Sequence, residues 1–413
     1  MLKKILSALI IVSAFFTING AFAQSSKVDS SSFVKLRIDP QAAKGTKVSN
    51  IFENVNFIPL ETKKESLFGR IARLKVIENT FLVYDSDSRT IFIFDSKGKY
   101  VNKIEANKID DGNKTINLFN FEVQNENNEK VIVIKGGKYV FLYDLNGKFI
   151  KKADQKYDIN TGRTRIENSK YSYQKNWQSS DSTKYGFAFF MDDKINSTYF
   201  PVKQNTQTRD YYLSVVGNNQ ENINRNYFIT RNYDYNIYQF QPPKLKLNYQ
   251  LIFPASYSLP ADFNENPIYI GEANRKLYFE NNKSVIYGLG NVHQFGRHLF
   301  FKVGTKSPIS ARRNALIYNT NTGELISIGN IEPDEKSYYL PITDIGNGVE
   351  FSFFGFLASD DKFLYTSYSS KSMFEFKDGS SEKSNKYNSV LTEYFGTQDK
   401  KSNPIIIQLK PKP

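Results

Sequence analysis

A strand-turn-strand unit occurs twice in this 413-residue chain, with the second copy 49 residues after the first. The first copy spans 91–103 and has the sequence IFIFDSKGKYVNK, and the second spans 140–152 and has the sequence VFLYDLNGKFIKK. Both copies end their first strand with Asp and place Gly-Lys three residues later, at Gly98 and Gly147. A repeat at this period predicts similar supersecondary units stacked beside one another, which here are the blades of a β-propeller.

The turns and strands of the remaining chain agree with this prediction. Glycine at the turn allows the positive φ of a tight hairpin, and Asp95 and Asp144 are placed to cap the two turns. Weaker copies of the hairpin are predicted at 316–326 and 373–379. No long segment has apolar residues at helical spacing, so the chain is predicted to be almost entirely β. Short aromatic and β-branched runs bounded by turn residues predict further strands at 81–84, 131–134, 276–279, 298–301 and 362–365.

The predicted architecture is a six-bladed β-propeller of four-stranded antiparallel blades, with seven blades as the alternative. Dividing residues 24–413 by blades of about 50 to 65 residues gives six or seven blades, and the spread of hairpins favours six. We expect that either the C-terminal segment 404–409 or the N-terminal segment 33–38 completes a blade built from the other end of the chain. Such closure would let every sheet cover the apolar faces of its neighbours.

The stretch 155–241 is rich in Asn, Gln, Tyr and Lys, and its strands are harder to place. Residues 185–190 and 211–216 still have the composition of strands. We therefore predict diverged blades with enlarged polar loops in this stretch, in preference to one long loop that protrudes from the ring.

The first 23 residues have the pattern of a cleaved secretory signal. Two lysines precede an apolar run at 5–18, and the sequence Ala-Phe-Ala ends at Ala23 before Gln24. The apolar run is short for a hydrocarbon core of about 30 Å, which disfavours an uncleaved membrane anchor. Cleavage between Ala23 and Gln24 is predicted to leave 24–413 as a single propeller domain in the periplasm or outside the cell, and no later stretch predicts a transmembrane segment.

Cysteine content and charge restrict the possible partners. The chain contains no cysteine, which excludes disulfides and a lipid anchor on an N-terminal cysteine. The formal net charge is +13. Lysines are scattered through turns, for example at Lys97, Lys148 and Lys151, so a mixed solvated surface is favoured over a nucleic-acid-binding face. Acidic glycans or lipopolysaccharide stay candidate electrostatic partners.

Four segments resemble a known family: VNFIPLET at 55–62, SLFGRI at 66–71, the hairpin at 81–104 and NPIIIQL at 403–409. These segments are similar to those of exported six-bladed β-propeller proteins of Bacteroidetes, which are catalogued mainly as a domain of unknown function. The resemblance implies an NHL-like or TolB-like ring and brings no agreed activity or catalytic residue. Many relatives carry Gly-Pro-Gly-Glu-Tyr after the first complete hairpin, and 105–117 has no such segment. Many are lipoproteins, which a chain without cysteine cannot match.

The sequence shows no recognisable catalytic or metal-binding motif. The chain has two histidines, His293 and His298, and no carboxylate lies between Gly288 and Val303, so structural or surface roles are predicted for both. Nucleophile-elbow, phosphate-binding and dinucleotide-binding motifs are absent. We predict no catalytic residue, no metal site and no cofactor. Paired aspartates are interpreted as turn formers and not as calcium ligands at Asp85, Asp87, Asp192, Asp193, Asp360 and Asp361.

The predicted function is that of a non-catalytic scaffold that binds a ligand or protein in the cell envelope or outside the cell. An unidentified envelope protein or a glycan is the expected partner, held by loops at one end of the ring. Trp177 is the best single candidate for stacking on a sugar, although packing within a blade or loop is favoured for it. The alternative is a propeller hydrolase or lyase that uses carboxylates, with or without calcium, and at least three Asp, Glu or Asn side chains should then meet at the mouth of the central channel. A nucleic-acid binder is the third option.

Overall fold

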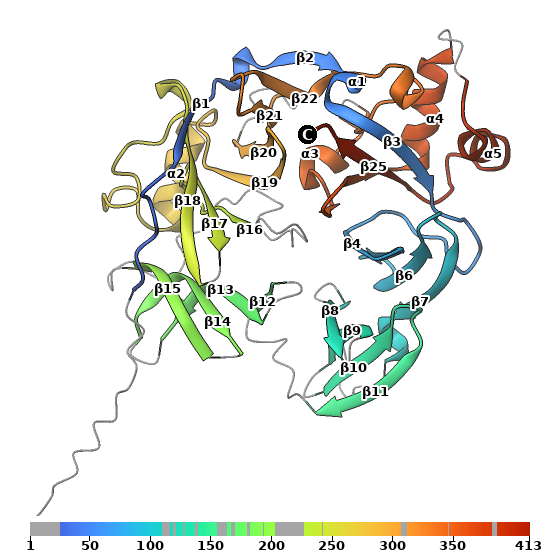
Figure 1. Cartoon of the computed structure of the whole chain (residues 1–413), viewed down its shortest axis with the longest axis horizontal. Helices are drawn as coiled ribbons and strands as arrows, with labels where there is room; N and C mark the ends of the chain where they lie inside the picture. Colours follow the sequence, from blue (N-terminus) through green and yellow to red (C-terminus); the bar gives the residue numbers. More distant parts are fainter. Residues whose placement is uncertain are drawn as a thin grey trace, which may run out of the picture.

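The computed structural model shows six small sheets arranged in a ring around a common axis (Figure 1). The predicted all-β, six-bladed β-propeller is therefore confirmed. The two repeated hairpins occupy equivalent positions in successive blades, as the repeat predicts. The structure describes residues 25–413 except 110–115, 119–120, 127–128, 137–138, 155–162, 167–169, 180–181, 193, 203–226, 242, 307–311, 346 and 382–385.

Blades 1 to 3 each consist of four consecutive antiparallel strands. Blade 1 contains β4 (Arg73–Ile77), β5 (Thr80–Asp85), β6 (Thr90–Asp95) and β7 (Tyr100–Glu105). Blade 2 contains β8 (Glu122–Glu126), β9 (Glu129–Gly136), β10 (Tyr139–Asp144) and β11 (Phe149–Asp154). Blade 3 contains β12 (Arg163–Arg165), β13 (Tyr171–Gln178), β14 (Lys184–Met191) and β15 (Lys194–Val202). The strand predicted at 185–190 lies in β14, whereas the one predicted at 211–216 lies outside the described residues.

Blades 4 to 6 each combine local strands with one strand from the N-terminal region. Blade 4 contains β16 (Tyr227–Ile229), β17 (Asn236–Gln241), β18 (Lys244–Ile252) and β1 (Val34–Arg37). Blade 5 contains β19 (Gly288–Phe295), β20 (His298–Gly304), β21 (Ala315–Asn319), β22 (Leu325–Glu332) and β2 (Lys44–Lys47). Blade 6 contains β23 (Ala358–Ser359), β24 (Leu364–Tyr368), β25 (Ile405–Pro411) and β3 (Phe52–Pro59).

Residues 25–59, which we call the strap, run along the outside of four blades. The strap makes single bridges to blade 3 and blade 4, pairs in parallel with β18 and β22, and finally pairs antiparallel with β25 (Figure 1). Closure of the ring thus joins the two ends of the chain in blade 6, where β25 lies between β24 and β3. The segment 33–38 contributes to blade 4 and does not complete the last blade.

The repeated turn is a contact between blades. In the first copy, Asp95 Oδ1 accepts hydrogen bonds from the backbone N–H groups of Lys97 and Lys99, each at 2.9 Å. Gly98 has φ +80°, and a Cβ added to it would lie 2.2 Å from the backbone oxygen of Pro59 in blade 6. Gly147 has φ +76°, and its added Cβ would lie 2.7 Å from Ile93 Cδ1 in blade 1. Glycine is needed at both turns for its conformation and for the close approach of the preceding blade.

The helices lie outside the blades, and two of them replace predicted β structure. The segment 276–279 belongs to α2 (Glu272–Asn281), and 373–379 belongs to α4 (Ser370–Gly379), so a strand and a hairpin were wrongly predicted there. In α4 the side chain of Ser369 accepts a hydrogen bond from Ser372 N and so caps the helix. The sequence prediction missed this N-cap because the aromatic run that follows it also fits a strand. The other helical segments are η1 (Pro40–Ala42), α1 (Val48–Ile51), η2 (Ala106–Lys108), η4 (Ala255–Tyr257), η5 (Glu335–Ser337), α3 (Glu350–Phe354) and α5 (Ser389–Thr397). Among the described residues, no helix combines the length and the apolar character that crossing a membrane requires.

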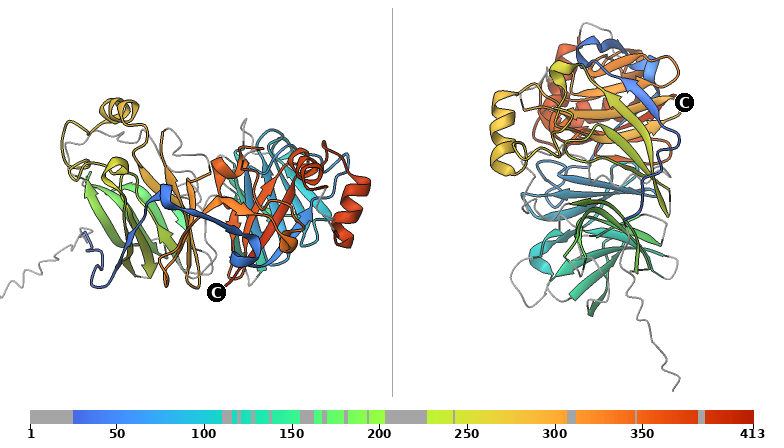
Figure 2. Two further views of the ribbon diagram at one scale, coloured as in Figure 1. Left: turned by 90° about the horizontal axis from the view of Figure 1, so that it is seen from above. Right: turned by 90° about the vertical axis from the view of Figure 1, so that its left-hand side faces the viewer.

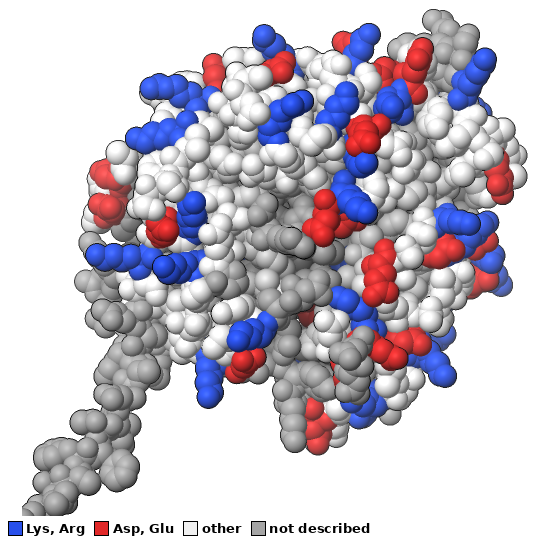
Figure 3. Space-filling model, in the orientation of Figure 1, with Lys and Arg blue, Asp and Glu red and all other residues white. Residues whose placement is uncertain are grey.

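Charges of both signs are interspersed over the face of the ring that Figure 3 shows, and the side view in Figure 2 shows helix α2 standing above the opposite face. Among the described residues on this face, the charges form no continuous basic surface of the kind that a nucleic-acid binder presents. This agrees with the scattered lysines of the sequence.

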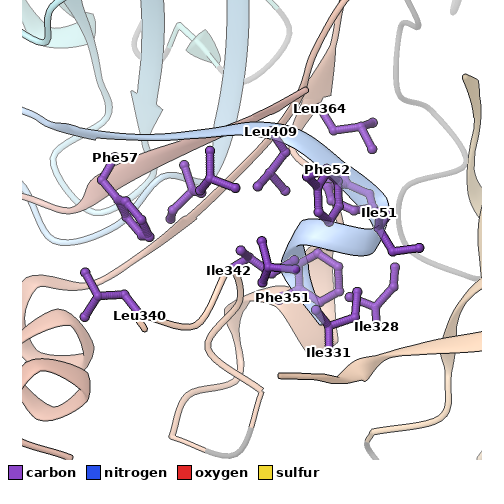
Figure 4. Close-up of a cluster of buried hydrophobic side chains, with 14 of the residues drawn as sticks. Ile51, Phe52, Phe57, Ile328, Ile331, Leu340, Ile342, Phe351, Leu364 and Leu409 are labelled. Carbon is purple, nitrogen blue, oxygen red and sulfur yellow. The ribbon is translucent and has the colours of Figure 1, made fainter. Parts of the chain in front are cut away.

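The core consists mainly of apolar layers between neighbouring blades. The largest layer joins blades 5 and 6 and includes Phe52 from the strap, Ile328 from β22 and Leu409 from β25 (Figure 4). Between blades 3 and 4, the rings of Phe189 and Phe240 stack with centroids 3.8 Å apart. Similar layers join blade 6 to blade 1, blade 1 to blade 2, and blade 4 to blade 5. Burial of aromatic faces between sheets is the main stabilising term that this arrangement provides.

Candidate functional site

Neighbouring strands within a blade run in opposite directions, so several long connections between blades lie at one end of the ring. The segment that leaves the last strand of one blade enters the first strand of the next blade at the same end, which we call the connector face. Helix α2, drawn in gold, stands above this face in the side view (Figure 2). The connections on the connector face are 60–72, 106–121, 253–287 and 333–357.

An open cleft with a volume of about 480 Å³ lies at blade 4 on the connector face. Its walls are the turn between β16 and β17, the end of β18 and the first part of the connection 253–287. The lining combines aromatic rings with hydroxyl, amide and carboxylate groups, and none of its described residues is a lysine or arginine. The lining residues are 233–236, 250–253, 258–261, 263 and 264.

Tyr235 fixes the two walls of the cleft to each other. Its hydroxyl donates a hydrogen bond to Ile286 O at 2.7 Å and accepts one from Leu259 N at 2.8 Å. Its ring meets Phe253 edge-on, with centroids 4.9 Å apart. Burial raises the pKa of the Tyr235 hydroxyl well above its usual value, so the group stays protonated and keeps donating.

Asp234 is the one charged residue among the described residues of the lining. Its carboxylate accepts hydrogen bonds from Asn236 N at 3.0 Å and from the Tyr238 hydroxyl at 2.8 Å, and it lies 3.5 Å from the guanidinium of Arg231. The Arg231 pair offsets the negative charge of the carboxylate. The cleft therefore suits a neutral ligand that is rich in hydrogen-bonding groups.

A buried arginine holds the outer wall of the cleft against helix α2. The Arg275 guanidinium lies over the rings of Tyr233 and Phe263, at 4.4 and 4.0 Å from their centroids. It also donates to Phe263 O at 2.7 Å and to Asn264 Oδ1 at 3.3 Å. Since Tyr233, Phe263 and Asn264 all line the cleft, Arg275 makes this wall part of a small aromatic core and not a free loop.

A second polar group surrounds helix α3, where the connection 333–357 crosses the seam between blades 5 and 6. Asp344 caps its N-terminal end by accepting from Glu350 N and Phe351 N, each at 2.8 Å. Lys302 from β20 donates to carbonyl oxygens at the other end, at 2.7 Å for Ser352 and 3.1 Å for Phe353. Burial lowers the pKa of Lys302 to about 8. The short helix is therefore fixed at both ends.

Glu350 is the most perturbed carboxyl group of this cluster. Burial, followed by the neighbouring Asp344 carboxylate, raises the pKa of Glu350 to about 7, against the opposing effects of Arg70 and a hydrogen bond from Ser367. Perturbed carboxyl groups of this kind are common at functional sites and also occur in structural networks. Among the described residues, no group of three His, Cys, Asp or Glu side chains is arranged to hold a metal ion.

The inner strands of blades 1 and 2 meet through an ionic contact. Glu122 Oε2 lies 3.2 Å from Lys75 Nζ, and Glu122 Oε1 lies 3.7 Å from Arg73 Nη2. The Arg73 guanidinium also donates to Phe121 O at 3.1 Å. These contacts join neighbouring blades and indicate a structural role for the three charged residues.

Both histidines are buried. The two residues lie on the neighbouring strands β19 and β20, where His293 Nδ1 is 3.1 Å from Ser359 Oγ and His298 Nδ1 is 3.1 Å from Lys412 O. Burial lowers the pKa of His293 to about 3. The surroundings of each histidine agree with a structural role, and neither histidine lines the cleft.

Trp177 lies in β13 and does not line the cleft. It is half-buried, stacks on Tyr185 with centroids 5.8 Å apart and meets Phe190 edge-on at 6.2 Å. These contacts are those of an aromatic side chain packed within its own blade, so its role in ligand binding stays a prediction. The predicted cleavage site at Ala23 and Gln24 lies outside the described residues.

Several predicted turn aspartates have the expected contacts. Asp85 Oδ2 accepts from Ser88 N at 2.9 Å, and Asp360 Oδ1 accepts from the backbone N–H groups of Lys362 and Phe363, each at 2.8 Å. Asp192 occupies a turn with φ 47°. Asp87 and Asp361 belong to the turns that Asp85 and Asp360 cap, and Asp193 lies outside the described residues.

The cleft residues were missed at the level of sequence because nothing in the repeat points to them. Tyr233, Asp234 and Tyr235 lie in a tyrosine-rich stretch that has no separate signal. The one available clue was the length of the connection 253–287, which is far longer than a turn between blades and contains many aromatic residues.

Comparison with known proteins identifies a family and a fold. The sequence pattern of a family described as a domain of unknown function, DUF4934, matches residues 34–410. No curated protein matches the chain. Among solved structures, an exported protein of Bacteroides fragilis is 15% identical and superposes with a TM-score of 0.62, covering 92% of this chain and 100% of its own.

Two further structures have weaker similarity. A member of the DUF4221 family from Bacteroides vulgatus is 10% identical, with a TM-score of 0.38 and coverage of 87% of this chain and 99% of its own. The extracellular domain of a one-component system from B. thetaiotaomicron is 9% identical, with a TM-score of 0.30 and coverage of 67% and 29%. The B. fragilis structure supports the propeller fold, and the match to DUF4934 confirms the predicted family resemblance.

Proposed function

Because the chain belongs to the DUF4934 family, whose description gives no activity, we propose its function from the cleft itself: a non-catalytic scaffold that binds a neutral glycan on the connector face. The observation that carries this proposal is the cleft at blade 4. It combines aromatic rings, amide and hydroxyl groups and one ion-paired carboxylate within about 480 Å³. Pockets of this size and polarity suit small polar ligands on a rigid frame.

The chemistry of the lining supports a sugar over an anionic ligand. The partly exposed ring of Tyr235 can pack against the C–H face of a sugar ring, and the Gln250 amide offers both a donor and an acceptor to hydroxyl groups. The amides of Asn236 and Asn264 form hydrogen bonds within the protein and shape the wall. The described part of the lining contains no lysine or arginine that would favour a phosphate or carboxylate. An unidentified envelope protein is the other partner that a rigid connector face would suit.

We also propose that the chain acts in the periplasm or outside the cell. The signal pattern at 1–23 supports this location, with cleavage between Ala23 and Gln24, and the similar B. fragilis protein is described as exported. Absence of cysteine supports a protein without a lipid anchor. We further propose that 24–413 form one domain and that the ring is of the NHL-like or TolB-like kind.

The cleft can be tested by filling it without removing a contact. Ala261 is exposed in the cleft wall, and Ala255 is exposed in η4 outside the lining, so Ala261→Trp and Ala255→Trp form a matched pair. A glycan array followed by isothermal titration calorimetry should identify a saccharide that binds residues 24–413. We expect Ala261→Trp to weaken binding at least tenfold at an unchanged thermal midpoint and Ala255→Trp to bind like wild type.

Two results would contradict the glycan-binding proposal. One is reproducible absence of binding across the array. The other is a bound saccharide whose affinity is unchanged in Ala261→Trp, since the ligand would then occupy another part of the ring.

A hydrolase or lyase is the second candidate, and one observation favours it. The pKa of Glu350 is raised to about 7 by burial and by Asp344, which would suit a general acid. The nearby Asp344 and Asn291 bind backbone groups around α3 at 2.8 to 2.9 Å. The saccharides that bind in the array can be assayed for cleavage by the protein. Cleavage that is lost in Glu350→Gln and kept in Ala261→Trp would favour this second candidate.

A further inference from the structure

The outer edges of the six blades are covered unequally. β1 and β2 lie outside β18 and β22 and pair with them in parallel, so the molecule twice uses the outer edge of a blade to bind an added strand. Among the described residues, no strand or bridge pairs with the outer edge of β7 or β11 (Figure 1). These two strands are the outer strands of blades 1 and 2.

Apolar side chains are exposed along these two uncovered strands. Phe149 and Ile150 at the start of β11 are 50% and 47% exposed, and Val101 in β7 is 43% exposed. The two strands are neighbours because Asn102 Nδ2 in β7 donates to Asn146 O at 3.0 Å, just before β11. An exposed edge with apolar residues is the feature that strand addition uses.

The charge of β11 indicates what kind of strand it would accept. Lys148, Lys151 and Lys152 lie at or beside this edge, against two acidic residues, Asp154 in the strand and Glu126 beside Lys151. Lys151 forms an ion pair with Glu126, and Lys152 lies 4.0 Å from the centroid of the Tyr139 ring. A second copy pairing antiparallel along β11 would place lysines opposite lysines, which is unfavourable. An acidic strand would meet complementary charge.

We propose that the outer edge of β11 binds an extended acidic segment of a partner protein by strand addition. Backbone hydrogen bonds would supply affinity, and alternate side chains of the segment would contact Phe149 or Ile150 and the lysines. Lysines on an edge also prevent unspecific pairing between copies, and the same charge selects an acidic partner. This site is separate from the cleft and does not depend on the proposed glycan.

The probe is a fluorescein-labelled hexapeptide of alternating Glu and Val, and fluorescence anisotropy with residues 24–413 measures its binding. We expect saturable binding that weakens at least tenfold in Lys151→Glu/Lys152→Glu. The matched control Lys400→Glu/Lys401→Glu makes the same charge change in the exposed segment before β25, in blade 6, and should bind like wild type. A peptide with N-methyl groups on alternate residues has the same charge but cannot complete the hydrogen-bond ladder, and it should not bind.

The proposal is overturned if the peptide does not bind saturably, if both charge variants lose binding equally, or if the N-methylated peptide binds as well as the unmodified one. Sedimentation of the protein alone provides a further check. A dimer that dissociates in Lys151→Glu/Lys152→Glu would assign this edge to a second copy and would also overturn the proposal.

Discussion

Blades 1 and 2 differ from blades 4, 5 and 6 in how the chain builds them. Blades 1 and 2 each use four consecutive strands and contain the repeated hairpin. Blades 4 to 6 each take one strand from residues 25–59, and their connections contain α2 and α3. In blades 1 and 2, which we call the regular half, each repeated turn contacts the preceding blade. Blades 4 to 6, which we call the irregular half, are held together by the strap.

The difference separates the scaffold from the candidate sites. The regular half preserves the repeat because each turn must fit against its neighbour, as the contacts of Gly98 and Gly147 show. In the irregular half the strap supplies outer strands, and the cleft and Glu350 both lie there, in or beside the long connections. Departures from a repeat are therefore the places to search for sites in chains of this kind.

The largest expected effect tests whether the repeated turn is a contact between blades. In Gly98→Ala the new Cβ would meet the backbone oxygen of Pro59 at 2.2 Å, so we expect a loss of ~3 kcal/mol or more in the free energy of unfolding. In Gly147→Ala the Cβ would meet the end of the Ile93 side chain, which can move, and the loss should be about 1–2 kcal/mol. Urea unfolding measures both.

Gly323→Ala is the control for backbone conformation alone. Gly323 has φ +76° but an added Cβ would have only the Tyr318 hydroxyl nearby, at 3.5 Å, so a loss of about 1 kcal/mol is expected. Equal losses in all three variants would show that positive φ alone explains the glycines and that the turns do not bind the preceding blade.

An effect of opposite sign, which depends on pH, is expected at α3 in the irregular half. The pKa of Glu350 in the folded state, about 7, is above its ordinary value of 4.5, so its contribution to stability is full below pH 4.5 and is lost as pH rises through 7. Glu350→Gln should therefore stabilise the protein above pH 7 by about 1–3 kcal/mol and have little effect at pH 4.

Urea unfolding of wild type and Glu350→Gln at pH 4, 6 and 8 measures this difference. The proposed pKa would be contradicted if the difference between the two proteins were the same at all three values. Destabilisation of Glu350→Gln at pH 8 would indicate instead that the ionised carboxylate is favourably paired with Arg70.

The fold could be predicted because its determinants are local. The Asp-x-x-Gly-Lys turns and the short aromatic strands each specify a hairpin, and two clear copies suffice to indicate a ring of blades. Helices α2 and α4 could not be predicted, because their runs at 276–279 and 373–379 combine aromatic and charged residues in a pattern that also fits a strand. Burial in the folded protein favours the helix over the strand in both segments, since Phe279 and Met373 are fully buried.

The candidate site could not be predicted because it depends on contacts between distant segments. Tyr235 meets Ile286 and Leu259, and Arg275 meets Tyr233, and no local pattern indicates these pairs. Trp177 was predicted as the residue that stacks on a sugar because it is the single tryptophan of the chain. The structure places its ring against Tyr185 and Phe190.

Closure of the ring in blade 6 can be measured directly, since the chain has no cysteine of its own. Asn56 in β3 and Gln408 in β25 are paired across the two strands although 352 residues separate them, and their side chains form a hydrogen bond at 2.9 Å. The double variant Asn56→Cys/Gln408→Cys should form an intramolecular disulfide in air and show a higher thermal midpoint than its reduced form, whereas Asn56→Cys/Lys401→Cys should stay reduced. Failure of the first pair to cross-link in the folded protein would contradict the pairing of the two chain ends.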